Sequence, residues 1–153
     1  MEHGGHAGYR VALAEAEAGA GEGGIPIGAA LFRGERLLGA GHNRRLQRRD
    51  PSAHAEIEAF RAAGLLDGYA DTTLFSTLTP CAMCCGAVVL FGVPLVVIGQ
   101  TRTYPAGPSL EYLRAHGTQV VDLGDERAVR LLDEFIQRNP AEWAKDNGEW
   151  SRR

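Results

Sequence analysis

Residues 72–91, TTLFSTLTPCAMCCGAVVLF, predict a strand followed directly by a helix, and this alternation recurs along the chain. The opening six residues are rich in β-branched and aromatic side chains and predict a strand over 72–77. Pro80 and Cys81 then open a helix that runs to about residue 91. Because helix positions three apart lie on one face, Cys81 and Cys84 are expected to direct both sulfur atoms at one point. The positive end of the helix dipole favours the thiolate form that metals bind.

A second short motif, His54-Ala55-Glu56, supplies the ligand type that the cysteines lack. The imidazole of His54 and the thiolates of Cys81 and Cys84 are three ligands of the kind that zinc takes in catalytic sites, where water completes the coordination. Glu56 is not needed as a ligand and is available to transfer protons. The pattern H-x-E followed by P-C-x-x-C is the signature of zinc-dependent nucleobase deaminases. We therefore predict one zinc ion per subunit, with Glu56 as the catalytic residue.

Two other interpretations of the cysteines stay open on the sequence alone. A structural zinc site needs a fourth protein ligand, and Cys85 is the obvious candidate. A lone Cys-x-x-Cys is also compatible with a redox pair. We favour the catalytic site, because Cys84 and Cys85 are adjacent and neighbours in a helix diverge by about 100°.

Composition bounds the class of protein. At 153 residues, with 44% hydrophobic and 23% charged residues, the chain has the size and composition of one soluble globular domain. Three cysteines, two of them assigned to a metal, leave no disulfide framework and indicate a reducing compartment. The start of the chain is polar, and the longest apolar run, 87–98, is too short to cross a bilayer. We expect a cytoplasmic protein with no membrane segment.

The charge balance argues against a nucleic-acid surface. The net charge is −3 and the pI is near 5.9, whereas such surfaces are normally basic. One basic cluster stands just before His54, formed by Arg44, Arg45, Arg48 and Arg49. A phosphate site there is an open alternative, but we favour a solvated loop or a subunit contact.

Strands and helices alternate along the chain, which predicts an α/β domain in three layers. The expected strands are 26–32, 35–41, 72–77, 95–98 and 119–122. The expected helices are 9–18, 53–63, 81–91, 109–115 and 126–138, with a final turn or short helix at 141–147. Glycines at 19, 21, 23 and 24 are expected to end the first helix, and a hairpin at Arg33-Gly34 makes the sheet mixed. The metal ligands then lie at the starts of two helices, where α/β sheets usually place their sites.

Short segments over nearly the whole chain carry a resemblance to a known family. They are 22–28 (EGGIPIG), 41–47 (GHNRRLQ), 54–56 (HAE), 71–74 (DTTL), 77–84 (TLTPCAMC), 125–127 (DER), 134–136 (EFI) and 139–149 (NPAEWAKDNGE). With them the chain resembles the fungal-type cytosine deaminases of the cytidine deaminase-like superfamily. The metal motif is common to that superfamily, whereas the C-terminal segment is particular to the enzymes that act on free cytosine.

The resemblance implies a three-layer α/β/α sandwich with a mixed five-stranded sheet, formed by one domain of residues 1–153 that assembles as a homodimer. It implies zinc bound by His54, Cys81 and Cys84, with Glu56 as proton shuttle. It also implies that residues 140–153 close the pocket over a nucleobase.

The substrate contacts are implied by the resemblance in the same way. Asn43 is expected to hold the edge of the pyrimidine ring, and Asp146 to meet its exocyclic amino group. Trp143 is expected to close the pocket, whose walls are Tyr104, Ile27 and Leu78. Three features depart from the family: Cys85 replaces a small polar residue, Tyr104 adds a hydroxyl where phenylalanine is usual, and 150–153 extends past the family end.

The expected activity is the hydrolytic deamination of free cytosine to uracil and ammonia. The first alternative is a deaminase of another free base or heterocycle, such as guanine, an aminotriazine or a modified pyrimidine. A catalytically silent zinc protein that binds nucleobases is disfavoured by Glu56. A tRNA- or single-strand-editing deaminase is disfavoured by the acidic balance and by the closing segment at Trp143.

Overall fold

The computed structural model describes residues 6–104 and 107–148. Its strands are β1 (Gly28–Arg33), β2 (Arg36–His42), β3 (Thr72–Leu78), β4 (Leu95–Gln100) and β5 (Gln119–Asp122). Its helices are α1 (Ala7–Gly21), α2 (Arg45–Arg48), α3 (Ala55–Ala63), α4 (Ala82–Phe91), α5 (Gly107–Ala115), α6 (Glu126–Arg138) and α7 (Pro140–Asp146). The expected strands and long helices are confirmed, and α2 is an element that the sequence pattern did not predict.

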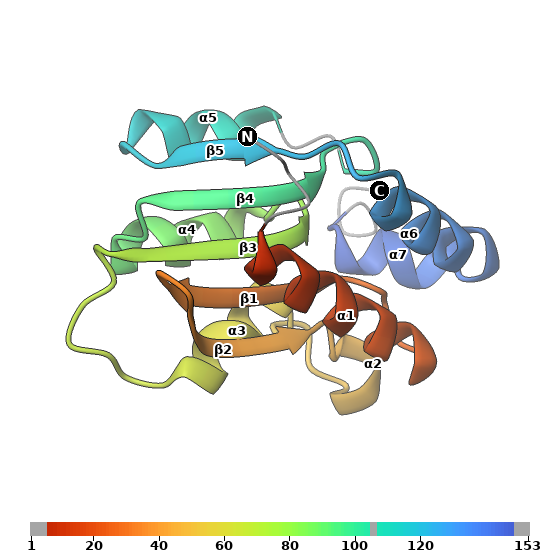
Figure 1. Cartoon of the computed structure of the whole chain (residues 1–153). Helices are drawn as coiled ribbons and strands as arrows, with labels where there is room; N and C mark the ends of the chain where they lie inside the picture. The colour runs from red at the N-terminus through yellow and green to blue at the C-terminus, as the bar shows by residue number, and fades with distance from the viewer. Residues whose placement is uncertain (1–5, 105–106, 149–153) are drawn as a thin grey trace.

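The five strands form one mixed sheet in the order β2-β1-β3-β4-β5 (Figure 1). Strand β1 pairs antiparallel with β2 and with β3, whereas β3–β4 and β4–β5 are parallel pairs. The first residue of β1 therefore lies beside the last residues of its neighbours, at the same end of the sheet as the C-terminal ends of β2, β3 and β4. Loops that leave this end of the sheet bring together residues that are far apart in the sequence.

Both faces of the sheet are covered by helices, so the three-layer expectation is confirmed. Neighbouring strand residues point to opposite faces. Phe32, Phe75 and Val97 pack in one buried cluster with residues of α1 and α6. Other strand residues pack in a second cluster with α3, α4 and α5; they include Leu31, Leu74, Val96 and Ile98. Figure 1 shows α1 in front of the sheet and α3 and α4 behind it.

The expected end of the first helix was wrong. Helix α1 continues through Gly19 to Gly21, and the backbone turns with a positive φ of 80° only at Gly23. A Cβ on Gly19 would lie 3.1 Å from the ring of His42, so the glycine permits close approach of the helix to β2. A glycine inside a helix costs only about 1 kcal/mol, which the packing of α1 on the sheet outweighs.

The helix starts also differ in detail from the prediction. His54 and Cys81 are the N-cap residues of α3 and α4, and Pro80 directly precedes the N-cap of α4. In the loop before α3, the Asp50 carboxylate accepts hydrogen bonds from the Ser52 backbone and hydroxyl. Within the described residues, no helix is long and apolar enough to cross a membrane.

Candidate metal centre and pocket

Three side chains from the starts of two helices converge on one point. His54 precedes α3, Cys81 precedes α4, and Cys84 lies in the first turn of α4. The Nδ1 atom of His54 lies 3.4 Å from the sulfur of Cys81 and 3.8 Å from that of Cys84. Tetrahedral zinc, with bonds of about 2.3 Å to sulfur and about 2.0 Å to nitrogen, separates its ligand atoms by roughly 3.5–3.8 Å. The donor set and its spacing therefore fit zinc.

The ligand group has three members, whose ligand atoms all lie within 4.8 Å of one another. In the part of the chain that the structure describes, Cys85 does not belong to it. Cys85 is buried in the core, its thiol donates to the Pro80 carbonyl at 3.5 Å, and burial raises its pKa to about 12. The arrangement of three ligands without Cys85 is that of a catalytic rather than a structural zinc site.

In the metal-free chain the pKa values of the three groups shift in different directions: that of Cys81 is lowered, and those of Cys84 and His54 are raised. A hydrogen bond from Cys84, together with His54, lowers the pKa of Cys81 to about 4. That same bond, with burial, raises the pKa of Cys84 well above its usual range. Burial works to lower the pKa of His54, but the bond to Cys81 and the charge of Asp146 outweigh it and raise the pKa to about 9. Zinc must displace these protons, because it binds thiolate and neutral imidazole.

We expect zinc affinity to rise with pH across the neutral range. Below a pKa of about 9 His54 carries a proton in the metal-free chain, and Cys84 stays a thiol, so each binding event releases protons. Competition against a chelator of known affinity at about pH 6, 7 and 8 measures the slope. A zinc affinity that is independent of pH over this range would contradict the ligand set.

Glu56 lies in the first turn of α3, beside the ligands, and is 4% exposed. Burial, reinforced by the charge of Cys81, raises its pKa to about 7 in the metal-free chain. A carboxyl group near its pKa at neutral pH both accepts and donates a proton readily. Glu56 is not among the three grouped metal-binding residues, so its carboxyl group is left for this chemistry.

One pocket lies against these groups and brings together every predicted substrate contact. Ile27 and Asn43 come from beside β1 and β2, Leu78 ends β3, Tyr104 follows β4, and Trp143 and Asp146 come from α7. The remaining lining residues are His54, Ala55, Glu56, Thr79, Cys81 and Asn147. The cavity that they line has a volume of only about 20 Å³, which is room for about one water molecule. Residues of the C-terminal segment beyond 148 lie outside the described part of the chain.

Asp146 joins the pocket to the metal ligands through polar contacts. Its Oδ1 atom accepts from the Asn43 amide at 3.2 Å and lies 3.4 Å from Nε2 of His54. A carboxylate on the outer nitrogen of a metal-binding histidine fixes the ring so that its other nitrogen faces the metal. Burial raises the pKa of Asp146, and the charge of His54 works against this. This contact with His54 could not be read from the sequence.

Three lining residues were not predicted, and one of them, Ala55, stands between His54 and Glu56. Thr79 stands between Leu78 and the Pro-Cys start of α4, and its hydroxyl faces the Gln100 carbonyl at 3.4 Å. Its position inside the motif is the signal that could have found it. Asn147 directly follows Asp146 and ends α7, and no local pattern distinguishes it from an ordinary helix end.

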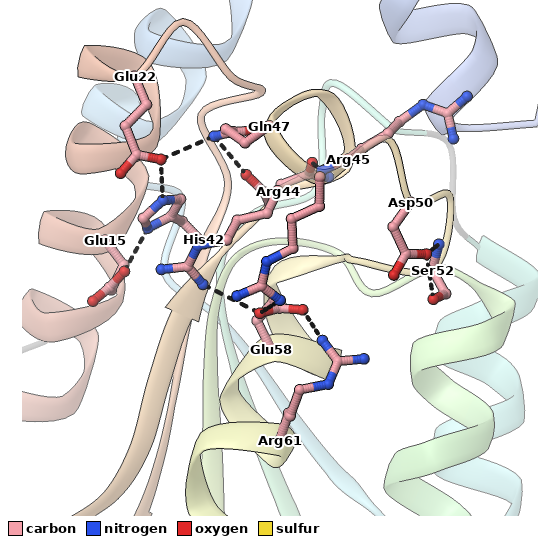
Figure 2. Close-up of polar contacts among 12 residues, drawn as sticks. Glu15, Glu22, His42, Arg44, Arg45, Gln47, Asp50, Ser52, Glu58 and Arg61 are labelled. Carbon is pink, nitrogen blue, oxygen red and sulfur yellow. Dashed lines mark hydrogen bonds and ion pairs between the residues drawn. The ribbon is translucent and has the colours of Figure 1, made fainter.

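Two members of the arginine cluster have a contact within the chain that the sequence pattern did not indicate. Arg44 and Arg48 donate to one oxygen of Glu58, at 3.2 and 2.8 Å. Arg61 pairs with the other oxygen, and Figure 2 labels Arg44 and Arg61 on either side of Glu58. The Glu58 side chain is only 3% exposed. Two arginines of the cluster therefore hold a buried carboxylate within the chain.

Comparison with known proteins places this site in a family. A family model for the cytidine and deoxycytidylate deaminase zinc-binding region matches residues 5–100. Cytosine deaminase from Candida albicans is 39% identical over 145 residues, which is 93% of this chain and 95% of that protein. A tRNA-specific adenosine deaminase from Buchnera aphidicola is 44% identical over 78 residues, 49% of this chain and 52% of that protein.

The fold has relatives of known structure. A guanine deaminase from Nitrosomonas europaea superposes with a TM-score of 0.71 at 27% identity, over 85% of this chain and 83% of that one. The family match, the near full-length relative and the ligand geometry agree with one another. The chain therefore belongs to the zinc-binding cytidine and deoxycytidylate deaminase family, and it is a deaminase of that superfamily.

Proposed function

We propose that this protein deaminates free cytosine, converting cytosine and water to uracil and ammonia. The observation that carries the proposal is the pocket beside the metal ligands, whose wall includes Trp143 and Asp146 of α7. Trp143 is only 7% exposed, so α7 is packed against the core. The likeness to cytosine deaminase over 93% of the chain supports the same substrate.

In this proposal His54, Cys81 and Cys84 hold zinc and Glu56 transfers the protons. Zinc bound there supplies an acidified water, with a pKa of roughly 7. Glu56 accepts a proton from the attacking water and delivers it to the ring nitrogen N3. It then accepts the second proton of that water, from the hydroxyl group now on C4, and gives it to the amino group, which leaves as ammonia while C4 becomes the carbonyl of uracil. One buried carboxyl group with a pKa near neutral suits both steps.

Asn43 and Asp146 are proposed to recognise the base. Asn43 donates one amide hydrogen to Asp146, and its carbonyl oxygen accepts from the Arg45 backbone at 2.9 Å. An amide has two N–H bonds and two acceptor lone pairs, so one of each remains for the adjacent donor and acceptor on a pyrimidine edge. Asp146 is proposed to accept from the exocyclic amine. Hydrophobic and aromatic side chains form the walls, namely Ile27, Leu78 and Tyr104.

The substrate proposal is tested by a deamination screen over cytosine, cytidine, guanine and an aminotriazine. Cytosine should react and cytidine should not, because a ribose on N1 would collide with Trp143. Asp146→Ala should lower activity on cytosine by at least about 100-fold, since a site with buried polar pairing discriminates strongly. Asp67→Ala, at an exposed position, is the matched control.

A preference for cytidine, or for guanine over cytosine, would overturn the cytosine assignment and leave the deaminase chemistry in place. Guanine is included because a guanine deaminase is among the structural relatives. Truncation after Pro140 removes Trp143 and Asp146 and should abolish activity on cytosine. Wild-type cytosine turnover by the truncated chain would show that α7 does not form the pocket.

We also propose a homodimer, formed through the outer face of α4. This helix, AMCCGAVVLF, has no charged residue, and a helix that is apolar on all sides is typically buried on all sides. Here Met83, Leu90 and Phe91 are 41%, 80% and 39% exposed. A second copy of the chain would cover this face.

We propose a cytoplasmic location as well. The three cysteines form no disulfide in the structure, which supports a reducing compartment.

Leu90→Glu is expected to convert the dimer to a monomer, because it places a charge in the centre of an apolar interface. Leu65→Glu is the control, since Leu65 is 99% exposed and lies outside α4. Sedimentation velocity on the zinc-loaded proteins distinguishes the two masses. A wild-type monomer, or a dimer that survives Leu90→Glu, would rule out this interface.

A further inference from the structure

A histidine outside the metal site is held between two carboxylates. His42 ends β2 and is 3% exposed. Its Nδ1 lies 2.6 Å from Oε2 of Glu15 and its Nε2 lies 2.8 Å from Oε1 of Glu22, both on or just after α1 (Figure 2). The ring therefore faces an acceptor oxygen on each side.

The chemistry of these contacts decides the state of the ring. An ionised carboxylate only accepts hydrogen bonds, and a neutral imidazole has only one N–H. When both partners are ionised, both contacts are hydrogen bonds only if both ring nitrogens carry hydrogen, as in imidazolium. Hydrogen bonds from His42 and Gln47 lower the pKa of Glu22, which keeps this partner ionised. The charged groups around the ring are Glu15 and Glu22, with Arg44 acting on Glu22 from the α2 side.

The hydrogen bonds around His42 extend to Asn43, the next residue in the chain, which lines the pocket. Gln47 donates to Glu22 at 3.1 Å and to the backbone carbonyl of Asn43 at 3.3 Å. The Asn43 backbone N–H donates to the Ile27 carbonyl at 2.9 Å. The Asn43 backbone is thus tied to the residue before β1 on one side and to the clamped ring, through Glu22 and Gln47, on the other.

Two glycines make room for this arrangement. A Cβ on Gly19 would lie 3.1 Å from the His42 ring, and one on Gly24 would lie 2.2 Å from the Gln47 amide nitrogen. Helix α1 and the turn that follows it can therefore close over both side chains. A substitution at Gly24 would displace Gln47 from Glu22 and Asn43.

We propose that His42 is a positioning residue for the pocket: as an imidazolium clamped by Glu15 and Glu22, it fixes the end of β2 and thereby orients Asn43 toward the base. The inference rests on the proposed role of Asn43 in binding substrate. His42 itself belongs neither to the pocket lining nor to the metal-binding group. Loss of the clamp should therefore weaken substrate binding and leave zinc content unchanged.

The protonation state is tested first, on the zinc-loaded wild-type protein and without any substrate. Nitrogen-15 NMR of histidine-labelled protein at neutral pH should show both ring nitrogens of His42 bonded to hydrogen. The His42 signals are identified by their absence from the spectrum of the His42→Gln protein. Glu17→Gln, at an exposed position of α1, is the control that should leave both signals in place. A ring with a single N–H would overturn the proposal.

The positioning role is tested by kinetics on the base that the wild type deaminates. His42→Gln should raise KM about tenfold, the size of one lost hydrogen bond, with kcat within about threefold, because uniform binding is lost rather than transition-state stabilisation. In His42→Gln, the amide of the new glutamine donates to one carboxylate with its NH2 group, so its oxygen is left facing the other carboxylate, which is also an acceptor. Adding Glu22→Gln supplies a donor and should return KM to within about threefold of the wild type.

The rescue is the result that a purely space-filling role would not produce. Additive losses in the double variant, or a wild-type KM in His42→Gln, would overturn the proposal. If His42→Gln does not fold, Glu22→Gln takes its place, because the Glu22 side chain is 48% exposed and the substitution is tolerated by the fold. The His42 ring signals are then identified by their shift in this variant. A raised KM supports the proposal, and a wild-type KM overturns it. Failure of the proposed function can be told apart from failure of the His42 proposal, because it appears as absent cytosine turnover in the wild-type protein.

Discussion

Replacing Cys84 by serine is expected to remove zinc and, with it, all measurable deamination. The Cys84 sulfur lies 3.8 Å from the His54 nitrogen, at the spacing of two ligands on one tetrahedral ion. A serine hydroxyl is a much weaker zinc ligand than a thiolate. Cys81→Ser should behave in the same way. Metal analysis of the purified proteins, with ammonia release measured in parallel, gives both quantities.

Cys85→Ser is the matched control, because it makes the same chemical change one residue along the helix. Cys85 faces the Pro80 carbonyl in the core, outside the three-ligand group. It should therefore retain about one zinc per subunit, as expected of a catalytic site with three protein ligands. Loss of zinc in Cys85→Ser combined with its retention in Cys84→Ser would reverse the ligand assignment.

Replacing Glu56 by glutamine is expected to keep zinc and lower turnover by at least about 100-fold, the usual scale for the loss of a proton-transfer group. Glutamine has nearly the same size and shape but cannot accept the proton. Zinc should stay because Glu56 is not one of the grouped metal-binding residues. Steady-state ammonia release and metal content are the measurements. Near-normal turnover would remove Glu56 from the mechanism.

The stability of this variant separates a chemical defect from a folding defect. Burial raises the pKa of Glu56 from 4.5 to about 7 in the folded, metal-free chain, so its ionisation lowers the free energy of unfolding as the pH rises between these values. Glutamine removes this penalty. The metal-free variant should therefore unfold at a temperature no lower than the wild type above pH 7, as measured by thermal denaturation. A marked decrease would mean that lost turnover reflects misfolding.

The order and type of most elements followed from local patterns. The strand at β3 and the helix at α4 were predicted from β-branched residues and from the Pro-Cys start, because each signal lies within a few residues. Prediction failed where a distant contact decided the local structure. Helix α1 continues through Gly19 because that glycine packs on His42 of β2, which comes later in the chain and belongs to another layer.

The sequence by itself determined the metal chemistry. The proposed ligands His54, Cys81 and Cys84 and the proposed proton-transfer residue Glu56 were predicted from two short motifs, because the spacing of each motif has a local physical meaning. The chain's membership of the deaminase family agrees with these motifs, because the matching family model covers residues 5–100 and includes both of them.

Only the tertiary structure showed which distant side chains meet one another. Asp146 meets Asn43 across 103 residues, and it also faces His54. His42 meets two carboxylates from another layer, and Glu58 is buried beneath three arginines. Such contacts depend on the order of strands in the sheet and on which helices cover each face. Local periodicity carries no information about either, because it records only the direction of neighbouring side chains.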